Sequence, residues 1–307
     1  MINRELIRLK SVQVLYAFYE NEGKDVLTAE KELFFSLDKG YEMYQHLLLL
    51  MVGLNHIALR VAETQQARAR RLGLEADVNQ KLINNRFLVQ LEQNEQLLAF
   101  RDAQKFSWLD HEDFLRRLYA QLQEQDFFQD YLHSSEDSYD EDRELWRKIY
   151  RNMLCNNDAL DEILEENSLY WNDDKVIVDT FILKTINKFK ESNAAQQPLL
   201  PKFKSEEDRT FASTLFTNAI RNADYYRELI SNQSHGWELT RLAHMDLVIM
   251  QLALSEIICC ESIPVNVSIS EYVEIARTYS TPRSAGYING ILDAIVKQLR
   301  ADGKINK

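Results

Sequence analysis

The chain has 307 residues, 45% of them apolar, which is enough for one large or two ordinary domains with a core that needs no metal or disulfide. Its 36 Lys and Arg against 48 Asp and Glu give a net charge of -12. This balance argues against a protein that coats nucleic acid nonspecifically, so any RNA site must be a local basic patch.

The amino terminus lacks the uninterrupted apolar core of a secretion signal, because four charged residues lie between positions 4 and 10. The longest apolar run, residues 47–54, is far shorter than the ~20 residues that cross a bilayer. The three cysteines form no CxxC pair and no cluster with histidines at metal-ligand spacing. We therefore expect a cytoplasmic protein with no membrane span, no metal and no cofactor.

The first two thirds of the chain predict long helices. All four prolines follow residue 197, and only four of the eight glycines precede them, so helix breakers are rare. Apolar residues recur at three- and four-residue spacing, as in Leu115, Leu118, Tyr119 and Leu122. The one β-branched run, residues 176–182, continues at helical spacing and is predicted to be helical. The sequence thus predicts an all-α fold, and no glycine-rich loop supports a nucleotide-binding α/β fold.

Polar segments interrupt this helical pattern. Residues 134–144 and 172–175 are acidic and are expected to form solvated connections between helices. Residues 191–208 combine amides, small residues and two prolines, which predicts a linker or long loop.

After this loop the sequence predicts a helix with its apolar face beginning at Phe211, ended by His235-Gly236. The next helix, residues 237–258, is apolar nearly all round, as in a helix central to a bundle. Asp246 and Glu256 fall within its apolar arcs. Because bare burial of a charge is costly, we expect each to be paired internally or placed at a helix end; contact with a partner is the alternative.

Two more helices are expected near the carboxyl end. Ser268 and Glu271 have the form of a capping box, which predicts a helix start. Thr281-Pro282 predicts another helix with proline at its first position. Gly286 and Gly290, one turn apart in that helix, predict close packing of a neighbouring helix, with close approach of a ligand as the alternative.

Together these segments resemble the NusB family. The likeness is carried by WELTRLAHMDLVIMQLALSEI from Trp237, IPVNVSISEYVEIA from Ile263 and YINGILD from Tyr287. Residues 4–16 add the pattern RxxxRxxxxQxLY, which is similar to the basic first helix of the family. The resemblance covers residues 1 to about 25 and about 208 to 300, and roughly 180 residues between them are extra.

The resemblance implies an all-α, NusB-like helical bundle of two subdomains, enlarged by a mainly helical insertion. We expect an N-terminal helix in residues 1–30, the insertion in 31–205, the C-terminal helical domain in 206–302 and a tail in 303–307. The predicted insertion holds 22 Lys and Arg against 30 Asp and Glu, so it carries most of the negative charge.

The resemblance also implies function. The family's role is transcription antitermination without catalysis: it binds boxA-type single-stranded RNA together with the small-subunit ribosomal protein NusE, in the RNA polymerase antitermination complex. In this sequence Arg4 and Arg8 would contact phosphate. Tyr16 and Tyr287 would contact RNA bases or sugars, and Asp246 would face the ribosomal protein.

The first helix departs from the family pattern. It has only three basic residues, Arg4, Arg8 and Lys10, where the family often has a denser arginine cluster, which implies weaker RNA binding by this helix. Arg283 stands where an acidic residue is common in the family, and it could supply a compensating phosphate contact. A solvated basic face remains the alternative for the basic residues, and a place in the core remains the alternative for Tyr16 and Tyr287.

The insertion contains a second basic group after its apolar segment. Solvent exposure on an amphipathic helix is the expected explanation, and RNA contact is the alternative. The group consists of Arg60, Arg68, Arg70 and Arg71.

Two other functions compete. The six histidines are scattered and none lies in an HExxH motif, and an RNA methyltransferase would need a glycine-rich cofactor loop that this sequence lacks. The stronger rival is an interaction scaffold that keeps the ribosomal-protein partner but not RNA binding. The small number of basic residues in the first helix and the negative net charge of the chain favour the scaffold.

Overall fold

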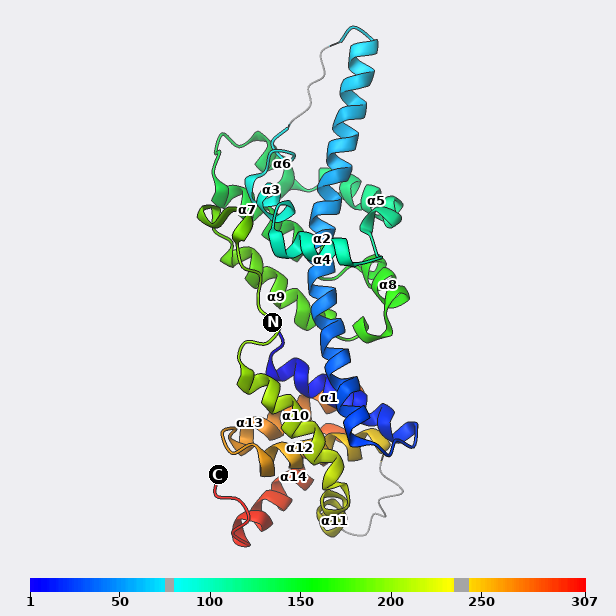
Figure 1. Cartoon of the computed structure of the whole chain (residues 1–307), viewed down its shortest axis with the longest axis vertical. Helices are drawn as coiled ribbons and strands as arrows, with labels where there is room; N and C mark the ends of the chain where they lie inside the picture. Colours follow the sequence, from blue (N-terminus) through cyan, green and yellow to red (C-terminus); the bar gives the residue numbers. More distant parts are fainter. Residues whose placement is uncertain (75–79, 235–242) are drawn as a thin grey trace. The chain divides into compact units, whose positions relative to one another are not determined.

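The protein is described by a computed structural model that covers residues 1–74, 80–234 and 243–307. Within these ranges every regular element is a helix, apart from one isolated β-bridge between Ile2 and Phe203 (Figure 1). The prediction of an all-α fold is confirmed. The chain divides into two compact units, Met1–Asp38 with Lys202–Lys307 and Lys39–Pro201.

The first unit is a helical bundle around α12 (His244–Cys259). Every residue from Val248 to Ile257 is buried, which confirms that this apolar segment forms the central helix. Five helices contact α12: α1 (Arg4–Glu20), α10 (Glu206–Arg221), α11 (Ala223–Gln233), α13 (Val265–Tyr279) and α14 (Ser284–Ala301).

Several predicted helix boundaries in this unit were wrong. The helix expected from Phe211 is two helices, separated at Asn222, whose side-chain amide donates to the backbone oxygen of Asn218 at 3.1 Å. The predicted end at His235-Gly236 and the first six residues of the segment 237–258 lie outside the described residues.

The predicted capping box is also wrong. Helix α13 begins at Val265, directly after Pro264, so Ser268 lies inside the helix. Its hydroxyl donates to a carboxylate on another helix instead, that of Glu256, at 2.8 Å. Helix α14 begins at Ser284 rather than at Pro282. In both cases the local motif is present but the helix starts elsewhere. The hydroxyl of Ser268 is used by a tertiary contact, whereas that of Thr281 lies 2.8 Å from the hydroxyl of Ser284.

The second unit contains the greater part of α2 (Val26–Arg71), the helix in which the division between the units falls. Its other α-helices are α3 (Arg86–Glu92), α4 (Glu95–Ala103), α5 (Glu112–Gln123), α6 (Asp126–His133), α7 (Tyr139–Ile149), α8 (Asp158–Asn167) and α9 (Lys175–Lys188). Shorter turns are η1 (Trp108–His111), η2 (Tyr150–Leu154), η3 (Leu169–Trp171) and η4 (Glu191–Gln196).

The structure of this unit tests two of the expectations from the sequence. Residues 176–182 lie inside α9, so the prediction that this β-branched run is helical is confirmed. The acidic stretch 134–144 is only partly a solvated connection, because α7 begins at Tyr139 and Asp142 is buried.

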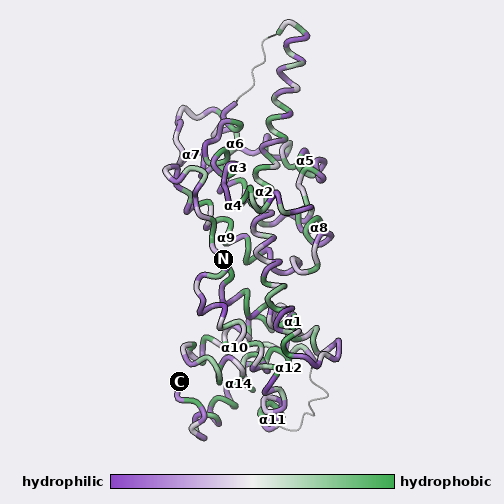
Figure 2. The backbone as a smooth tube through the Cα atoms, in the orientation of Figure 1, coloured by the Kyte–Doolittle hydropathy of each residue, from purple (hydrophilic) through white to green (hydrophobic). Residues whose placement is uncertain are grey.

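Helix α2 provides much of the core of this unit. A Cβ at Gly53 would lie 3.3 Å from the Cβ of Trp108, so the glycine lets η1 approach closely. The Trp108 indole N–H donates to the backbone oxygen of His46 at 2.6 Å. An 18-residue window of α2 is long and apolar enough to cross a membrane by composition, but 61% of it is buried inside the protein, as in a core helix. Hydrophilic and hydrophobic residues alternate along most of the helices (Figure 2).

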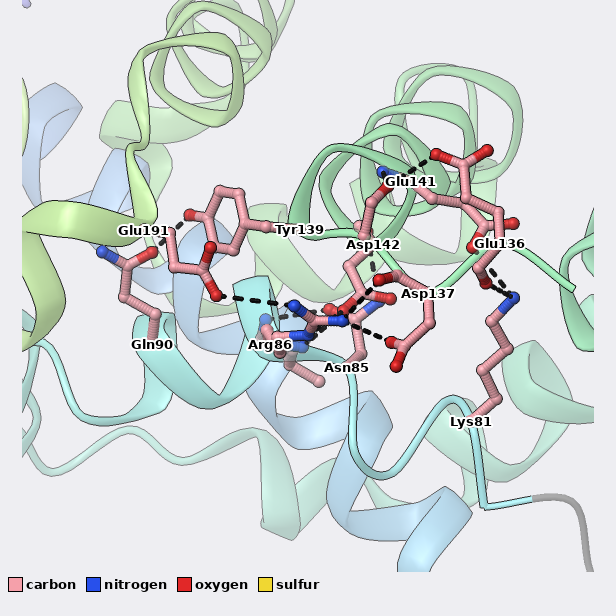
Figure 3. Close-up of polar contacts among 12 residues, drawn as sticks. Lys81, Asn85, Arg86, Gln90, Glu136, Asp137, Tyr139, Glu141, Asp142 and Glu191 are labelled. Atoms are coloured by element: carbon pink, nitrogen blue, oxygen red, sulfur yellow. Dashed lines mark hydrogen bonds and ion pairs between the residues drawn. The ribbon is translucent and has the colours of Figure 1, made fainter.

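A polar network joins α3 to α7 (Figure 3). At its centre the buried Asp142 accepts hydrogen bonds from the Tyr131 hydroxyl at 2.6 Å and from the backbone N–H of Arg86 at 2.8 Å. Asn85 caps α3 and donates its amide to the backbone oxygen of Asp142 at 3.1 Å. The Arg86 guanidinium pairs with Asp137. Each buried polar group is thereby satisfied, which makes this helix pair specific in register.

Helix α2 also carries a buried histidine, His46. The ring of His46 is 1% exposed and packs against Phe100 and Phe106, with ring centroids 4.9 and 4.8 Å away. Neither ring nitrogen has a hydrogen-bond partner among the described residues, although Nε2 lies 3.9 Å from a carboxylate oxygen of Glu42. Burial lowers the pKa of His46 to about 4, and the charge of Lys39 acts in the same direction.

We expect His46→Gln to flatten the loss of stability in acid. In the wild type the unfolded chain protonates His46 below a pH of about 6.5, whereas the folded chain does so only near pH 4. The free energy of unfolding therefore falls as the pH drops through this window, by up to about 3 kcal/mol from this residue. Urea unfolding of wild type and variant between pH 7 and 4 measures the difference.

The exposed His133 provides the control, and His133→Gln should keep the wild-type pH profile. Parallel profiles for the wild type and His46→Gln would contradict the assignment.

Candidate functional site

The basic first helix is anchored by a buried ion pair. Arg8 Nε and Nη2 each donate to Glu256 at 2.9 Å, and Nη1 donates to Glu271 at 3.0 Å. Arg8 is 4% exposed and Glu256 is fully buried. The carboxylate of Glu256 also accepts hydrogen bonds from the hydroxyls of Ser268 and Tyr272, at 2.8 and 3.2 Å. The expectation that Glu256 is paired internally is confirmed.

The surroundings keep the guanidinium of Arg8 charged. Burial disfavours the charged guanidinium, but the hydrogen bonds and the negative charge of Glu256 outweigh it and raise the pKa of Arg8. Burial and the neighbouring Glu256 raise the pKa of Tyr272 well above its ordinary value, so this hydroxyl stays a donor. Arg8 therefore holds three helices together, and its guanidinium is enclosed by carboxylates rather than open to phosphate.

The other basic residues of α1 differ in exposure. Arg4 keeps 37% of its side chain exposed, lies 3.4 Å from Asp208 and places its guanidinium 5.2 Å from the ring centre of Phe211. Lys10 is 1% exposed. Of the three basic residues expected to meet RNA on this helix, only Arg4 presents a substantial surface to solvent.

An aromatic group lies at the other end of α1. The ring of Tyr16 is 5.2 Å from that of His244, and the ring of Tyr19 is 5.9 Å from the same histidine. Tyr16 and Tyr19 are half-buried, and His244 keeps 38% of its side chain exposed. The Arg227 guanidinium lies 5.0 Å from the ring centre of Tyr19. These side chains form a partly exposed aromatic surface with a cation beside it.

Asp246, in the first turn of α12, supports the start of α14. It is 6% exposed, and its carboxylate accepts hydrogen bonds from the hydroxyl of Ser280 and, at 2.8 Å, from that of Ser284. Its place near a helix end, with its oxygens satisfied, agrees with the first expectation for this residue. The contact fixes the position of Arg283, which directly precedes α14.

The first turns of α14 carry an open stripe. Arg283, Gly286, Tyr287 and Gly290 recur at the spacing that puts residues on one helix face. Arg283 is exposed and has no carboxylate partner among the described residues, and Tyr287 is half-buried with its hydroxyl donating to Ser234 at 3.2 Å. The prediction of close helix packing at the glycines is wrong, since a Cβ at Gly286 or Gly290 would meet no neighbouring atom of the described residues within 4 Å.

The structure thus separates the predicted site residues into two groups. Tyr16 contacts the start of α12 through His244, and the start of α12 holds the start of α14 through Asp246. Arg8 instead meets the far end of α12, about 12 Å along α1 from Tyr16 at the helical rise of 1.5 Å per residue.

Sequence reasoning missed part of the aromatic group. Tyr19 is three residues after Tyr16, so it shares a helix face with it, and this spacing could have been noticed. His244 and Arg227 come from distant segments, and no local pattern pointed to them. Among the described residues, no three His, Cys, Asp or Glu side chains are grouped so that they could hold a metal ion, and all three cysteines are free thiols.

Known proteins match the part of the chain that carries these surfaces. The family model described as the NusB family matches residues 180–297. The Transcription antitermination protein NusB of Salinibacter ruber is 34% identical over 132 residues, which span 41% of this chain and 82% of that protein. The protein of the same name from Thermodesulfovibrio yellowstonii is 34% identical over 127 residues, 41% of this chain and 80% of that protein. That from Natranaerobius thermophilus is 42% identical over 89 residues, 29% of this chain and 64% of that protein. No solved structure matches.

We expect Glu256→Ala to lower the free energy of unfolding by about 3–5 kcal/mol, because it leaves the buried guanidinium of Arg8 without its main partner. Guanidinium chloride unfolding followed by circular dichroism measures the loss. The double variant Arg8→Met, Glu256→Leu should recover much of it.

Glu274→Ala serves as the control, since Glu274 is exposed and its one ion pair among the described residues is with the exposed Arg277. Equal stability of the Glu256 and Glu274 variants would show that the buried pair does not hold these helices.

Proposed function

The chain belongs to the NusB family, and from this we propose that it acts in transcription antitermination. It binds boxA-type single-stranded RNA together with the small-subunit ribosomal protein NusE, within the RNA polymerase antitermination complex in the cytoplasm, and it catalyses no reaction. Its relatives carry the name of a transcription antitermination protein. The finer parts of this proposal rest on the surfaces described above.

The observation that carries RNA binding is the open stripe of α14. Arg283 is exposed without a carboxylate partner, so its charge is available to a phosphate. Tyr287 follows one turn later and offers a ring on which an unpaired base can stack. The bare backbone at Gly286 and Gly290 lets the RNA approach closely.

The remaining predicted residues contribute to binding either directly or indirectly. Tyr16 supplies a second aromatic ring beside His244, and Arg4 contributes its partly exposed charge to the RNA backbone. Arg8 and Lys10 act indirectly, since both are buried and shape α1 from within. Asp246 contributes to the NusE-facing surface by holding the start of α14 through Ser284.

A scaffold that binds NusE without RNA is the second candidate. The burial of Arg8 and Lys10 favours it, because the first helix then offers RNA little positive charge beyond Arg4. The two candidates differ in one measurable property, the affinity for RNA that depends on α14.

Titration of a short labelled boxA-type RNA, with and without purified NusE, tests the proposal. Tyr287→Ala should weaken binding by about 5- to 150-fold, because stacking on an aromatic ring contributes ~1–3 kcal/mol per base. Tyr287→Phe, which keeps the ring, should bind nearly as well as wild type. Arg283→Ala should reduce the slope of log affinity against log salt by about 0.7, the value for one phosphate contact.

Arg277→Ala is the matched control, because Arg277 is exposed on α13 but already pairs with Glu274 at 2.6 Å. NusE binding by a protein whose RNA affinity is unchanged in every α14 variant would favour the scaffold.

A further inference from the structure

The far end of α2 is a basic tip that the proposed function does not use. We define the α2 tip as residues 63–74, none of which is buried. In Figure 1 these last turns of α2 extend past the other helices of the second unit. The tip carries three arginines, Arg68, Arg70 and Arg71, against one acidic residue, Glu63. Its net charge is therefore positive in a chain whose total is -12.

These three arginines are exposed and have no carboxylate partner among the described residues. Elsewhere in the same unit most arginines are neutralised by nearby carboxylates, and only Arg117 and Arg151, which stand singly, are exposed without such a partner among the described residues. Six are paired in this way: Arg60, Arg86, Arg101, Arg116, Arg143 and Arg147. The tip is thus a place where positive charge is left open to a ligand.

The arginines are not needed to complete the end of the helix. Gly73 adopts a positive φ of 66°, and its N–H donates to the backbone oxygen of Arg70 at 3.2 Å. The N–H of Leu74 donates to the backbone oxygen of Ala69 at 3.0 Å. This pair of bonds is a Schellman motif, which satisfies the last carbonyl groups with backbone donors. The cap thus takes no guanidinium donor of the three arginines, which also have no carboxylate partner among the described residues.

The arginines also surround the helix. At about 100° per residue, Arg70 and Arg71 point about 200° and 300° away from Arg68 around the axis. Such an arrangement does not form one flat basic face. A flexible ligand with regularly spaced negative charges, which can wrap around the end of a helix, fits this arrangement.

We propose that the α2 tip is a second RNA-binding site, which grips the phosphates of single-stranded RNA without regard to boxA. Guanidinium forks bind phosphate oxygens in pairs and stack on unpaired bases, and all three cations of the tip are arginines. This inference rests on the proposed function in one respect, because both take RNA as the ligand. The tip lies in the Lys39–Pro201 unit, whereas Arg283 and Tyr287 lie in the other unit.

The test uses the full chain and a single-stranded RNA of about 15 nucleotides that contains no boxA sequence, a length in the range of single-strand binding sites. The triple variant Arg68→Ala, Arg70→Ala, Arg71→Ala should bind this RNA at least tenfold more weakly than wild type at low salt. The slope of log affinity against log salt should fall by about 2, as expected for three phosphate contacts on a single strand. Alanine favours the helix, so the variant should fold normally.

The matched control is Arg101→Ala, Arg116→Ala, Arg147→Ala, which removes the same charge from arginines of the same unit that already pair with carboxylates. It should keep RNA affinity within about twofold, because paired arginines contribute few phosphate contacts. Replacing the three tip arginines with lysine should keep the salt dependence, since the charge remains, but weaken binding, since the guanidinium forks and their stacking are lost.

Equal losses in the tip and control variants would overturn the proposal, because net charge alone would then explain the binding. Unchanged RNA binding in the tip variant would also overturn it, as would a tip that binds anionic lipid vesicles but no RNA. Binding of boxA-type RNA that depends on Tyr287 is measured separately, so failure of the tip leaves the α14 site in place.

Discussion

The buried ion pair between Arg8 and Glu256 closes the first unit. Its partners are 248 residues apart in the chain and lie on α1 and α12, and Glu271 brings in α13. A guanidinium enclosed by carboxylates, hydroxyls and the ring of Phe211 has one satisfactory position. Any slip of α1 along the bundle would leave a buried charge unpaired, which costs several kcal/mol. The pair therefore sets the register of the helices that carry the candidate surfaces.

The same unit explains how the chain accommodates a long insertion. The backbone N–H of Ile2 donates to the oxygen of Lys202 at 2.6 Å, and Lys202 pairs with Asp38. The chain thus leaves the first unit and returns to it at neighbouring points. Because these points are joined within the first unit, a second compact unit can fold between them without opening the bundle.

Some arginines of this protein pair with carboxylates and stabilise the fold, whereas others are exposed and unpaired within the described residues. Arg8 is buried against carboxylates, and Arg4 lies against Asp208 and Phe211. The exposed and unpaired Arg283 and the arginines of the α2 tip are placed differently, since nothing in the described residues neutralises them. In an acidic chain such unpaired cations mark where phosphate can bind. The placement moves the proposed RNA contacts from the first helix toward α14 and α2.

The sequence by itself determined the helical class, the central position of α12 and the likeness to the NusB family. These follow from helical spacing, from the scarcity of glycine and proline, and from motifs within single segments. It also predicted an internal partner for Glu256, because burial of a bare carboxylate is costly. Local motifs were weaker guides to helix ends, as Ser268 shows.

Only the tertiary structure decided which residues meet. It paired Arg8 with Glu256, placed His244 beside Tyr16 and left Gly286 and Gly290 exposed to solvent. It also showed that the arginines of the α2 tip have no carboxylate partner among the described residues, while six others of the same unit are neutralised. The physical reason is that periodicity along one helix specifies which face is buried. The partner of a buried charge, and the exposure of a basic one, depend on segments that only folding brings together.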